Sequence, residues 1–363
     1  MILKIFTFWR IGLFAITYLG AKAFPQVANG GLGAKNESQS FSYLLSWAQW
    51  DGGHYFEIAK NGYTDFTQYA FFPAYPVSIK VLDTLLPLNT LQTGLIISNI
   101  CFLAFLYVFY HFLKKCYTSK TAINTLITFF CFPTTFFAVA FYTEGLFLLL
   151  AALFFYFLYQ NKYQNAAIVI ALASLTRFVG IFLILALFYK SFSAMKLKTF
   201  KVKNVLIPYA ISFVGILTYI VYLAKTTNNP LAFLAAQSNW QRTSTDPIST
   251  IIGSIWTIAT NPNTPPDQYL DVVVTVSFIG ILIAGIKKIP SSLWIFSMLV
   301  VLVPASTGTL ASMPRYALSS LGAFIIIGNF LEKYPKLKTP LWAFMLMLQA
   351  ILAVKFVNGY WVA

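Results

Sequence analysis

Long apolar runs separated by short polar turns dominate the chain from end to end. After an apolar run at residues 5–24, further runs occupy 92–113, 121–141, 145–160, 165–189, 204–224, 271–286, 291–310, 316–331 and 340–359. A helix needs about 20 apolar residues to cross the hydrocarbon core of a bilayer. The pattern therefore predicts an all-α, polytopic membrane protein, with residues 1–363 forming a single integral membrane domain.

The basic residues of the short connections predict how these helices are oriented. They gather at Lys114, Lys115 and Lys120; at Lys190, Lys196, Lys198, Lys201 and Lys203; at Lys287 and Lys288; and at Lys333, Lys336 and Lys338. Short loops rich in Lys and Arg stay on the cytoplasmic side. Alternation from these connections places the N-terminus in the cytoplasm and gives about eleven spans. It also requires the run 165–189 to form two short helices that turn near Arg177.

Two segments lie between the apolar runs, and the orientation places both on the outer face. Residues 71–87 of the first segment, 25–90, are apolar but contain three prolines, Lys80 and Asp83. A stretch so short and interrupted favours an interfacial or re-entrant helix. We therefore expect residues 25–90 to form an outer catalytic loop with interfacial helices, and residues 225–270 to form a second long outer loop.

Composition agrees with a membrane protein and indicates which face is the working one. Hydrophobic residues make up 58% and charged residues 10% of the chain, and the mean hydropathy is +0.72. The net charge of +15 would suit a nucleic-acid partner, but lysines in short connections explain it by topology. Nine acids are expected on or near the outer face: Glu37, Asp51, Glu57, Asp65, Asp83, Glu144, Asp246, Asp267 and Asp271. Acids contribute little to orientation, so their asymmetry indicates chemistry or architecture at the outer face.

The most distinctive local segment is Trp50-Asp51-Gly52-Gly53-His54-Tyr55. Glycines let a backbone approach a ligand closely, and an acid among aromatic residues suits a sugar whose hydroxyl proton it can accept. The alternative is an N-cap role for Asp51, which the spacing alone favours. His54 shares a helix face with Asp51, but two residues are too few for a metal site. We expect no cofactor and leave a metal open.

Arg177 interrupts an apolar run, where an arginine costs about 2.5–3.5 kcal/mol on insertion scales. It should therefore have a partner or face a cavity. One interpretation is an ion pair with an outer-side acid such as Glu144, itself expected near a helix N-terminus. The other is a bidentate contact to a lipid-linked phosphate. Arg315-Tyr316, at another outer helix end, allows the same two interpretations.

Taken together, these segments resemble the PIG-V mannosyltransferase family. Trp50-Asp51-Gly52-Gly53-His54-Tyr55 is similar to its first-loop motif, and Phe71-Phe72-Pro73-Ala74-Tyr75-Pro76 to its Phe-x-Pro-x-x-Pro stretch. Later segments match in the same order: Tyr142-Thr143-Glu144-Gly145-Leu146-Phe147, Thr176-Arg177-Phe178-Val179-Gly180 and Pro314-Arg315-Tyr316. The chain departs from the family at Phe178-Val179, where the family has a polar Ser-Asn pair.

The resemblance implies a GT-C-type bundle and an inverting membrane glycosyltransferase. The donor would be a polyprenyl-phosphate sugar, with mannose favoured, and the acceptor a lipid or glycan on the outer or lumenal face. The membrane would be the plasma membrane if the source is prokaryotic. A phosphate leaving group needs cations more than the second carboxylate of a glycosidase. We therefore expect Asp51 to be the general base, with substrate contacts from Trp50, His54, Tyr55, Tyr75, Tyr142, Glu144, Arg177, Arg315 and Tyr316.

Two other classes of protein share the membrane pattern. A polytopic transporter or flippase of a lipid-linked or sugar substrate would explain many spans and intramembrane charge. Transporters often show repeated halves, and the sequence shows no internal repeat. A non-catalytic partner subunit of a larger membrane enzyme is the third possibility. The identity of the acceptor and the need for a partner subunit stay open at this point.

Overall fold

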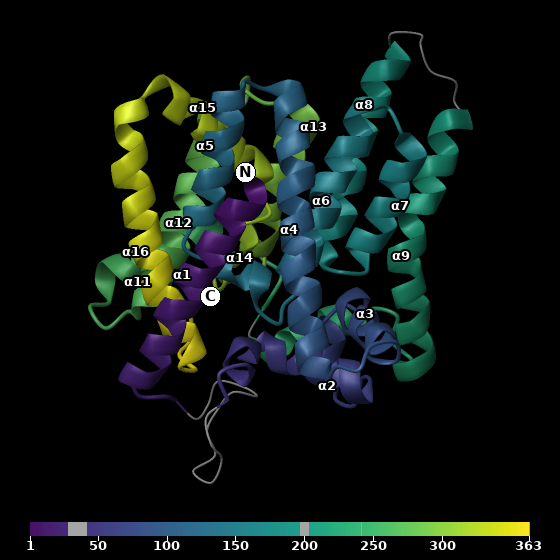
Figure 1. Ribbon diagram of the computed structural model, residues 1–363. Coiled ribbons are helices and arrows are strands. Elements are labelled where there is room, and N and C mark those ends of the chain that lie inside the picture. The colour runs from purple at the N-terminus through teal and green to yellow at the C-terminus, as the bar shows by residue number, and fades with distance from the viewer. Residues whose placement is uncertain (28–41, 197–202, 241, 363) are drawn as a thin grey trace.

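The computed structural model describes residues 1–27, 42–196, 203–240 and 242–362, and the regular structure of these residues is helical throughout (Figure 1). Some sequence-based expectations fall on residues outside these ranges. Glu37, expected on the outer face, and Lys198 and Lys201, expected inside, are among them. The same is true of residues 28–41 within the predicted first outer loop.

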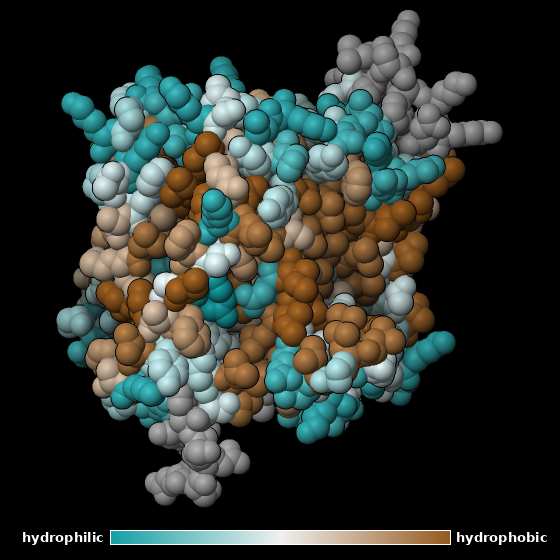
Figure 2. All heavy atoms as spheres, in the orientation of Figure 1, coloured by the Kyte–Doolittle hydropathy of each residue, from teal (hydrophilic) through white to brown (hydrophobic). Residues whose placement is uncertain are grey.

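Long apolar helices form the body of the molecule. They are α1 (Ile2–Ala23), α4 (Thr90–Cys116), α9 (Lys203–Thr227), α12 (Pro266–Ala284) and α16 (Lys338–Val357). Within the described residues, five helical segments are long and apolar enough to cross a membrane. On the face that Figure 2 shows, a largely hydrophobic band lies between two polar ends. The fold is therefore that of an all-α membrane protein, while the count of eleven spans stays a prediction.

Shorter helices complete the bundle. They are α5 (Ser119–Cys131), α6 (Glu144–Tyr159), α7 (Tyr163–Ser174), α8 (Leu183–Lys196), α13 (Ser291–Ala305), α14 (Met313–Ala317) and α15 (Leu321–Lys333). The run 165–189 forms two helices joined by a 3₁₀ turn, η4 (Phe178–Phe182), as the orientation argument requires. The run 121–141 is not one helix. Its helix ends at Cys131 because Pro133 keeps Phe132 extended, and η3 (Thr135–Val139) follows.

The segment before α4 forms a layer of short helices at one end of the bundle. It contains η1 (Leu45–Ala48), α2 (Asp51–Asn61), η2 (Phe66–Ala70) and α3 (Ala74–Asp83). A helix does form within residues 71–87, namely α3, which packs on α2 and α4, and its interfacial position stays a prediction. Figure 1 shows α2 and α3 at the lower end, whereas the α4–α5 and α15–α16 connections lie at the upper end. Which end faces the cytoplasm stays a prediction.

Residues 225–270 are expected as a long loop, but their described part contains three helices between α9 and α12. These are α10 (Ala232–Ala236), η5 (Gln237–Trp240) and α11 (Pro247–Thr260). The start of α11 follows from local chemistry, because Asp246 accepts a hydrogen bond from the backbone N–H of Ser249 at 2.8 Å and Pro247 suits the first helical position. α10 packs against η2. The segment therefore folds back over the layer of short helices instead of extending from it.

Candidate functional site

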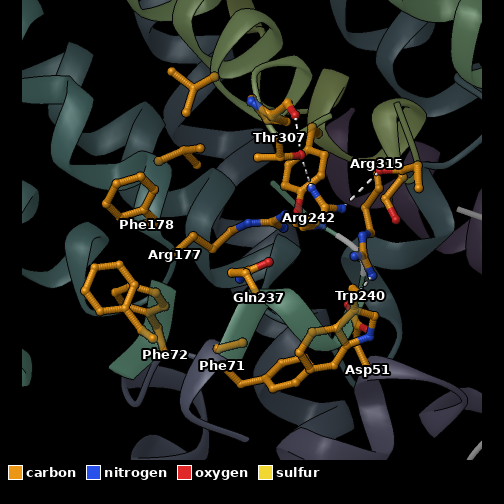
Figure 3. Close-up of a pocket in the computed structure, with 18 of the residues that line it drawn as sticks. Asp51, Phe71, Phe72, Arg177, Phe178, Gln237, Trp240, Arg242, Thr307 and Arg315 are labelled. Carbon is orange, nitrogen blue, oxygen red and sulfur yellow. Dashed lines mark hydrogen bonds and ion pairs between the residues drawn. The ribbon is translucent and has the colours of Figure 1, made fainter. Parts of the chain in front are cut away.

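A cavity of about 580 Å³ lies where the layer of short helices, the 225–270 segment and the ends of several bundle helices meet. Its apolar wall includes Phe71, Phe72, Phe178, Phe233, Trp240 and Trp361. Its charged lining consists of Asp51, Glu144, Arg177, Arg242 and Arg315. Figure 3 shows the three arginines converging, with Asp51 below Arg315 and with Phe72 and Phe178 across the cavity from Asp51. The site is therefore half aromatic and half ionic.

Asp51 owes its position to unusual backbone geometry on both sides. Trp50 precedes α2 with φ 53°, a region sparsely populated by residues other than glycine. At Gly52, a Cβ would lie 3.2 Å from the carbonyl oxygen of Phe141 and 3.3 Å from the ring of Tyr142. Glycine thus lets α2 approach the residue 141–142 turn closely. The N-cap role considered for Asp51 is wrong, because Trp50 is the N-cap and Asp51 is the first helical residue.

The charged residues form a continuous network. Nη1 of Arg315 lies 2.7 Å from Oδ2 of Asp51 in an ion pair, and its Nε lies 3.4 Å from Oε1 of Glu144. The same Glu144 oxygen pairs with Nη1 of Arg177. Glu144 is the first residue of α6, where the positive end of the helix dipole favours a carboxylate. The ion-pair interpretation of Arg177 is therefore confirmed, and its contact with a phosphate stays a prediction.

Aromatic rings support the cations of this network. The guanidinium of Arg315 lies 5.3 Å from the ring centre of Tyr142, whose hydroxyl donates to the carbonyl of Gln49 at 2.8 Å. The ring of Tyr316 has the guanidinium of Arg177 at 5.2 Å and that of Arg242 at 5.7 Å. Cations over aromatic faces gain up to about 2 kcal/mol where water is excluded. The rings hold the cations close together without neutralising them.

The structure brings most of the predicted site residues to this cavity. Those that line it are Asp51, Tyr55, Tyr142, Glu144, Arg177, Arg315 and Tyr316. Trp50, His54 and Tyr75 are packed elsewhere. The Trp50 ring meets Trp361 edge-on at 5.0 Å, and the Tyr75 hydroxyl is buried and lies 2.8 Å from Oγ of Ser98.

His54 packs behind the wall of the cavity. Its ring stacks on Phe71 with the ring centres 4.6 Å apart, and it meets Trp240 edge-on at 6.0 Å. Burial lowers the pKa of His54 below its ordinary value, although the negative charges of Asp51 and Asp65 oppose this. The imidazole is therefore neutral at pH 7. Among the described residues, no group of three or more His, Cys, Asp or Glu residues could hold a metal ion.

Arg242 is a lining residue that the sequence analysis did not single out. It follows η5, and its Nη1 donates to Oγ1 of Thr307 at 3.0 Å while its Nη2 donates to the carbonyl of Ala311 at 3.2 Å. The signal that could have found it is a single arginine in a segment expected on the outer face. Its position depends on contacts about 65 residues along the chain, which no local pattern reveals.

Comparisons with known proteins agree with this picture. The family model described as Mannosyltransferase (PIG-V) matches residues 7–237, well over half of the chain. No curated protein matches the chain.

Solved structures share its fold. ArnT from Cupriavidus metallidurans bound to undecaprenyl phosphate has a TM-score of 0.53 at 11% identity, over 98% of this chain and 74% of that one. The apo Archaeoglobus fulgidus oligosaccharyltransferase has a TM-score of 0.50 at 12% identity, over 100% of this chain and 56% of that one.

Proposed function

The chain belongs to the PIG-V mannosyltransferase family, and from that premise we propose that it transfers a mannosyl group from a polyprenyl phosphate to a lipid or glycan hydroxyl. We place this reaction on the outer or lumenal face of the membrane. The fold supports a GT-C-type glycosyltransferase, because the similar structures are enzymes of that class. The donor class is inferred from the family and from the cavity, which combines two carboxylates with three arginines.

In this mechanism Asp51 is the general base. One of its oxygens is held by Arg315 at 2.7 Å, whereas the other accepts no hydrogen bond from the described part of the chain. The acceptor hydroxyl would give its proton to this oxygen as its own oxygen attacks the anomeric carbon. The new C–O bond forms as the bond to the phosphate oxygen breaks, and the electron pair leaves with the phosphate. Attack opposite the leaving group inverts the anomeric centre.

The arginines stabilise the negative charge that develops on the departing phosphate. Guanidinium groups fixed before the reaction act strongly in a site from which water is excluded. Arg315 also fixes the orientation of the Asp51 carboxylate, and Glu144 keeps Arg177 and Arg315 in place from the other side. The aromatic wall at Phe71, Phe72 and Trp240 offers faces on which a sugar ring or a prenyl chain can pack.

The observation that carries this proposal is the position of Asp51 at the cavity, with one oxygen oriented by an arginine. The test is transfer of radiolabelled mannose from polyprenyl-phosphate-mannose to membrane lipid or glycan by the purified protein. Asp51→Asn should lower transfer by about 10²–10⁴-fold, the range for general base catalysis. Glu57→Gln is the matched control, because Glu57 lies on the same helix, bonds to Asn61 and does not line the cavity.

The outcomes separate the possible roles. Equal transfer by wild type and by a folded Asp51→Asn variant would remove Asp51 from the mechanism. A wild-type protein that moved the lipid-linked sugar across a bilayer without breaking its glycosidic bond would be a flippase instead.

A further inference from the structure

We propose that Arg242 is the residue that grips the phosphate of the lipid donor and of the released lipid phosphate. The inference rests on the proposed function and assigns a role within it to a residue beyond the 7–237 family match. It depends on which of the three arginines carries a positive charge that no carboxylate balances.

Arg177 and Arg315 are already engaged by carboxylates. Together with Asp51 and Glu144 they form two cations and two anions in mutual contact, so that the group carries no net charge. Each of them has N–H donors to spare, but its positive charge is already balanced by a carboxylate. Exchanging that carboxylate for a phosphate would leave a buried carboxylate unpaired, which is costly.

Arg242 differs in having no carboxylate within 4.0 Å among the residues that the structure describes. A guanidinium has five N–H donors, and two hydrogen bonds, to Thr307 and Ala311, are made by the side chain of Arg242. The remaining donors are available at the lining of the cavity. With Arg242 the five charged lining residues carry one net positive charge, which matches the single negative charge of a phosphodiester donor.

The backbone around Arg242 is built to hold this side chain in place. The N–H of Thr243 donates to the carbonyl of Thr307 at 2.9 Å, and that of Thr245 donates to the carbonyl of Ser306 at 3.0 Å. At Gly308, with φ 78°, a Cβ would lie 2.7 Å from Oγ1 of Thr243, so the two segments approach closely. Fixed donors stabilise an anion without reorganising, which favours binding of the phosphate.

The ring of Tyr316 also links Arg242 to the reacting end of the cavity. The guanidinium groups of Arg242 and Arg177 both contact this ring, and Arg315 precedes it in α14. A phosphate held by Arg242 would therefore lie on the same side of the network as the guanidinium groups of Arg177 and Arg315. Asp51 would lie on the far side of Arg315 from it (Figure 3). This arrangement keeps the general base and the leaving group apart, as inversion requires.

The experiment measures binding of undecaprenyl phosphate to the purified full-length protein, with undecaprenol as the ligand that lacks the phosphate. Loss of a hydrogen-bonded charged group should weaken binding of the phosphate by about 10- to 100-fold in Arg242→Gln. Binding of undecaprenol should not change. Arg242→Lys should bind with intermediate affinity, because an ammonium keeps the charge but lacks the planar fork. Lys80→Gln, which removes a cation from the exposed surface of α3, should bind like the wild type.

Each result has a definite meaning. Suppose that the wild type transfers mannose and that Arg242→Gln binds undecaprenyl phosphate as tightly as the wild type does. This result would overturn the role of Arg242 and leave the proposed function standing. A wild type that binds undecaprenyl phosphate no better than undecaprenol would overturn the donor class and this assignment with it. If Arg242→Gln does not fold, Thr307→Val provides the test. It removes the hydroxyl that orients Nη1 and should weaken binding several-fold, and unchanged binding would contradict the proposal.

Discussion

Glu144 and Arg177 form a buried ion pair, and the loss of folding stability should depend on which of the two partners is removed. The Glu144 side chain is 2% exposed and meets two arginines. In Glu144→Gln, Arg177 loses its carboxylate partner among the described residues, whereas Arg315 keeps Asp51 at 2.7 Å. In Arg177→Met, by contrast, Glu144 keeps Arg315 at 3.4 Å. The structure therefore predicts that the glutamate substitution is the more damaging one.

The magnitude follows from the cost of leaving a buried charge without its partner. Removal of one member of a buried ion pair costs about 3–5 kcal/mol. We expect Glu144→Gln to fall in this range and Arg177→Met below it, since an arginine remains beside the carboxylate. The double variant should be more stable than the sum of the single effects predicts, by about 0.5–3 kcal/mol of coupling. This is because the second substitution removes the charge that the first one left unpaired.

The assay is a double-mutant cycle on the free energy of unfolding in detergent micelles. Glu57→Gln is the control for loss of a carboxylate, because the hydrogen bond from Asn61 to Glu57 lies at an exposed position. Its effect should stay within about 0.5 kcal/mol, as for surface substitutions in general. Additivity of the two single effects, or a larger cost for Arg177→Met than for Glu144→Gln, would refute the reasoning.

Three further outcomes are expected. Gly145→Ala should destabilise the protein by about 1–3 kcal/mol, because its Cβ would lie 2.5 Å from the Ala138 carbonyl oxygen. Gly12→Ala, with open space around it, should leave the stability unchanged, and thermal unfolding of both variants checks this. Burial lowers the pKa of His54, so the wild type should lose folding stability as the pH falls below about 6.5, the pKa of histidine in the unfolded chain. His54→Phe should abolish this loss, and unfolding measured as a function of pH checks it. Tyr75→Phe should cost about 1 kcal/mol while leaving the KM for the donor unchanged, because its hydroxyl bonds to Gly94 and Ser98 away from the cavity.

The parts of the fold that could be predicted from the sequence are those governed by local patterns. Apolar runs predicted the long helices, and the alternation set by the basic connections predicted the turn near Arg177 between α7 and α8. Glu144 begins α6, as expected of an acid that favours the positive end of a helix dipole. Pro133 was the local signal that α5 ends early.

The parts that could not be predicted depend on contacts between distant segments. The 225–270 segment is expected as a long loop, yet α10 packs on η2 and the backbone of Thr243 pairs with that of Thr307. Arg242 enters the cavity only because of this folding back. Its partners come from a turn after α13, and no spacing along the chain relates the two. A local pattern can therefore indicate that a cation is exposed without showing what it faces.

The motif around Asp51 shows the same limit on a smaller scale. Asp51 and Tyr55, four residues apart on α2, both line the cavity, whereas His54 lies between Phe71 and Trp240. Spacing alone placed Asp51 and His54 on one helix face, and it could not say which neighbour would cover the imidazole. The family motif therefore identifies the segment that meets the substrate. The packing of that segment separates the side chains that can touch a sugar or phosphate from those that hold the helix in place.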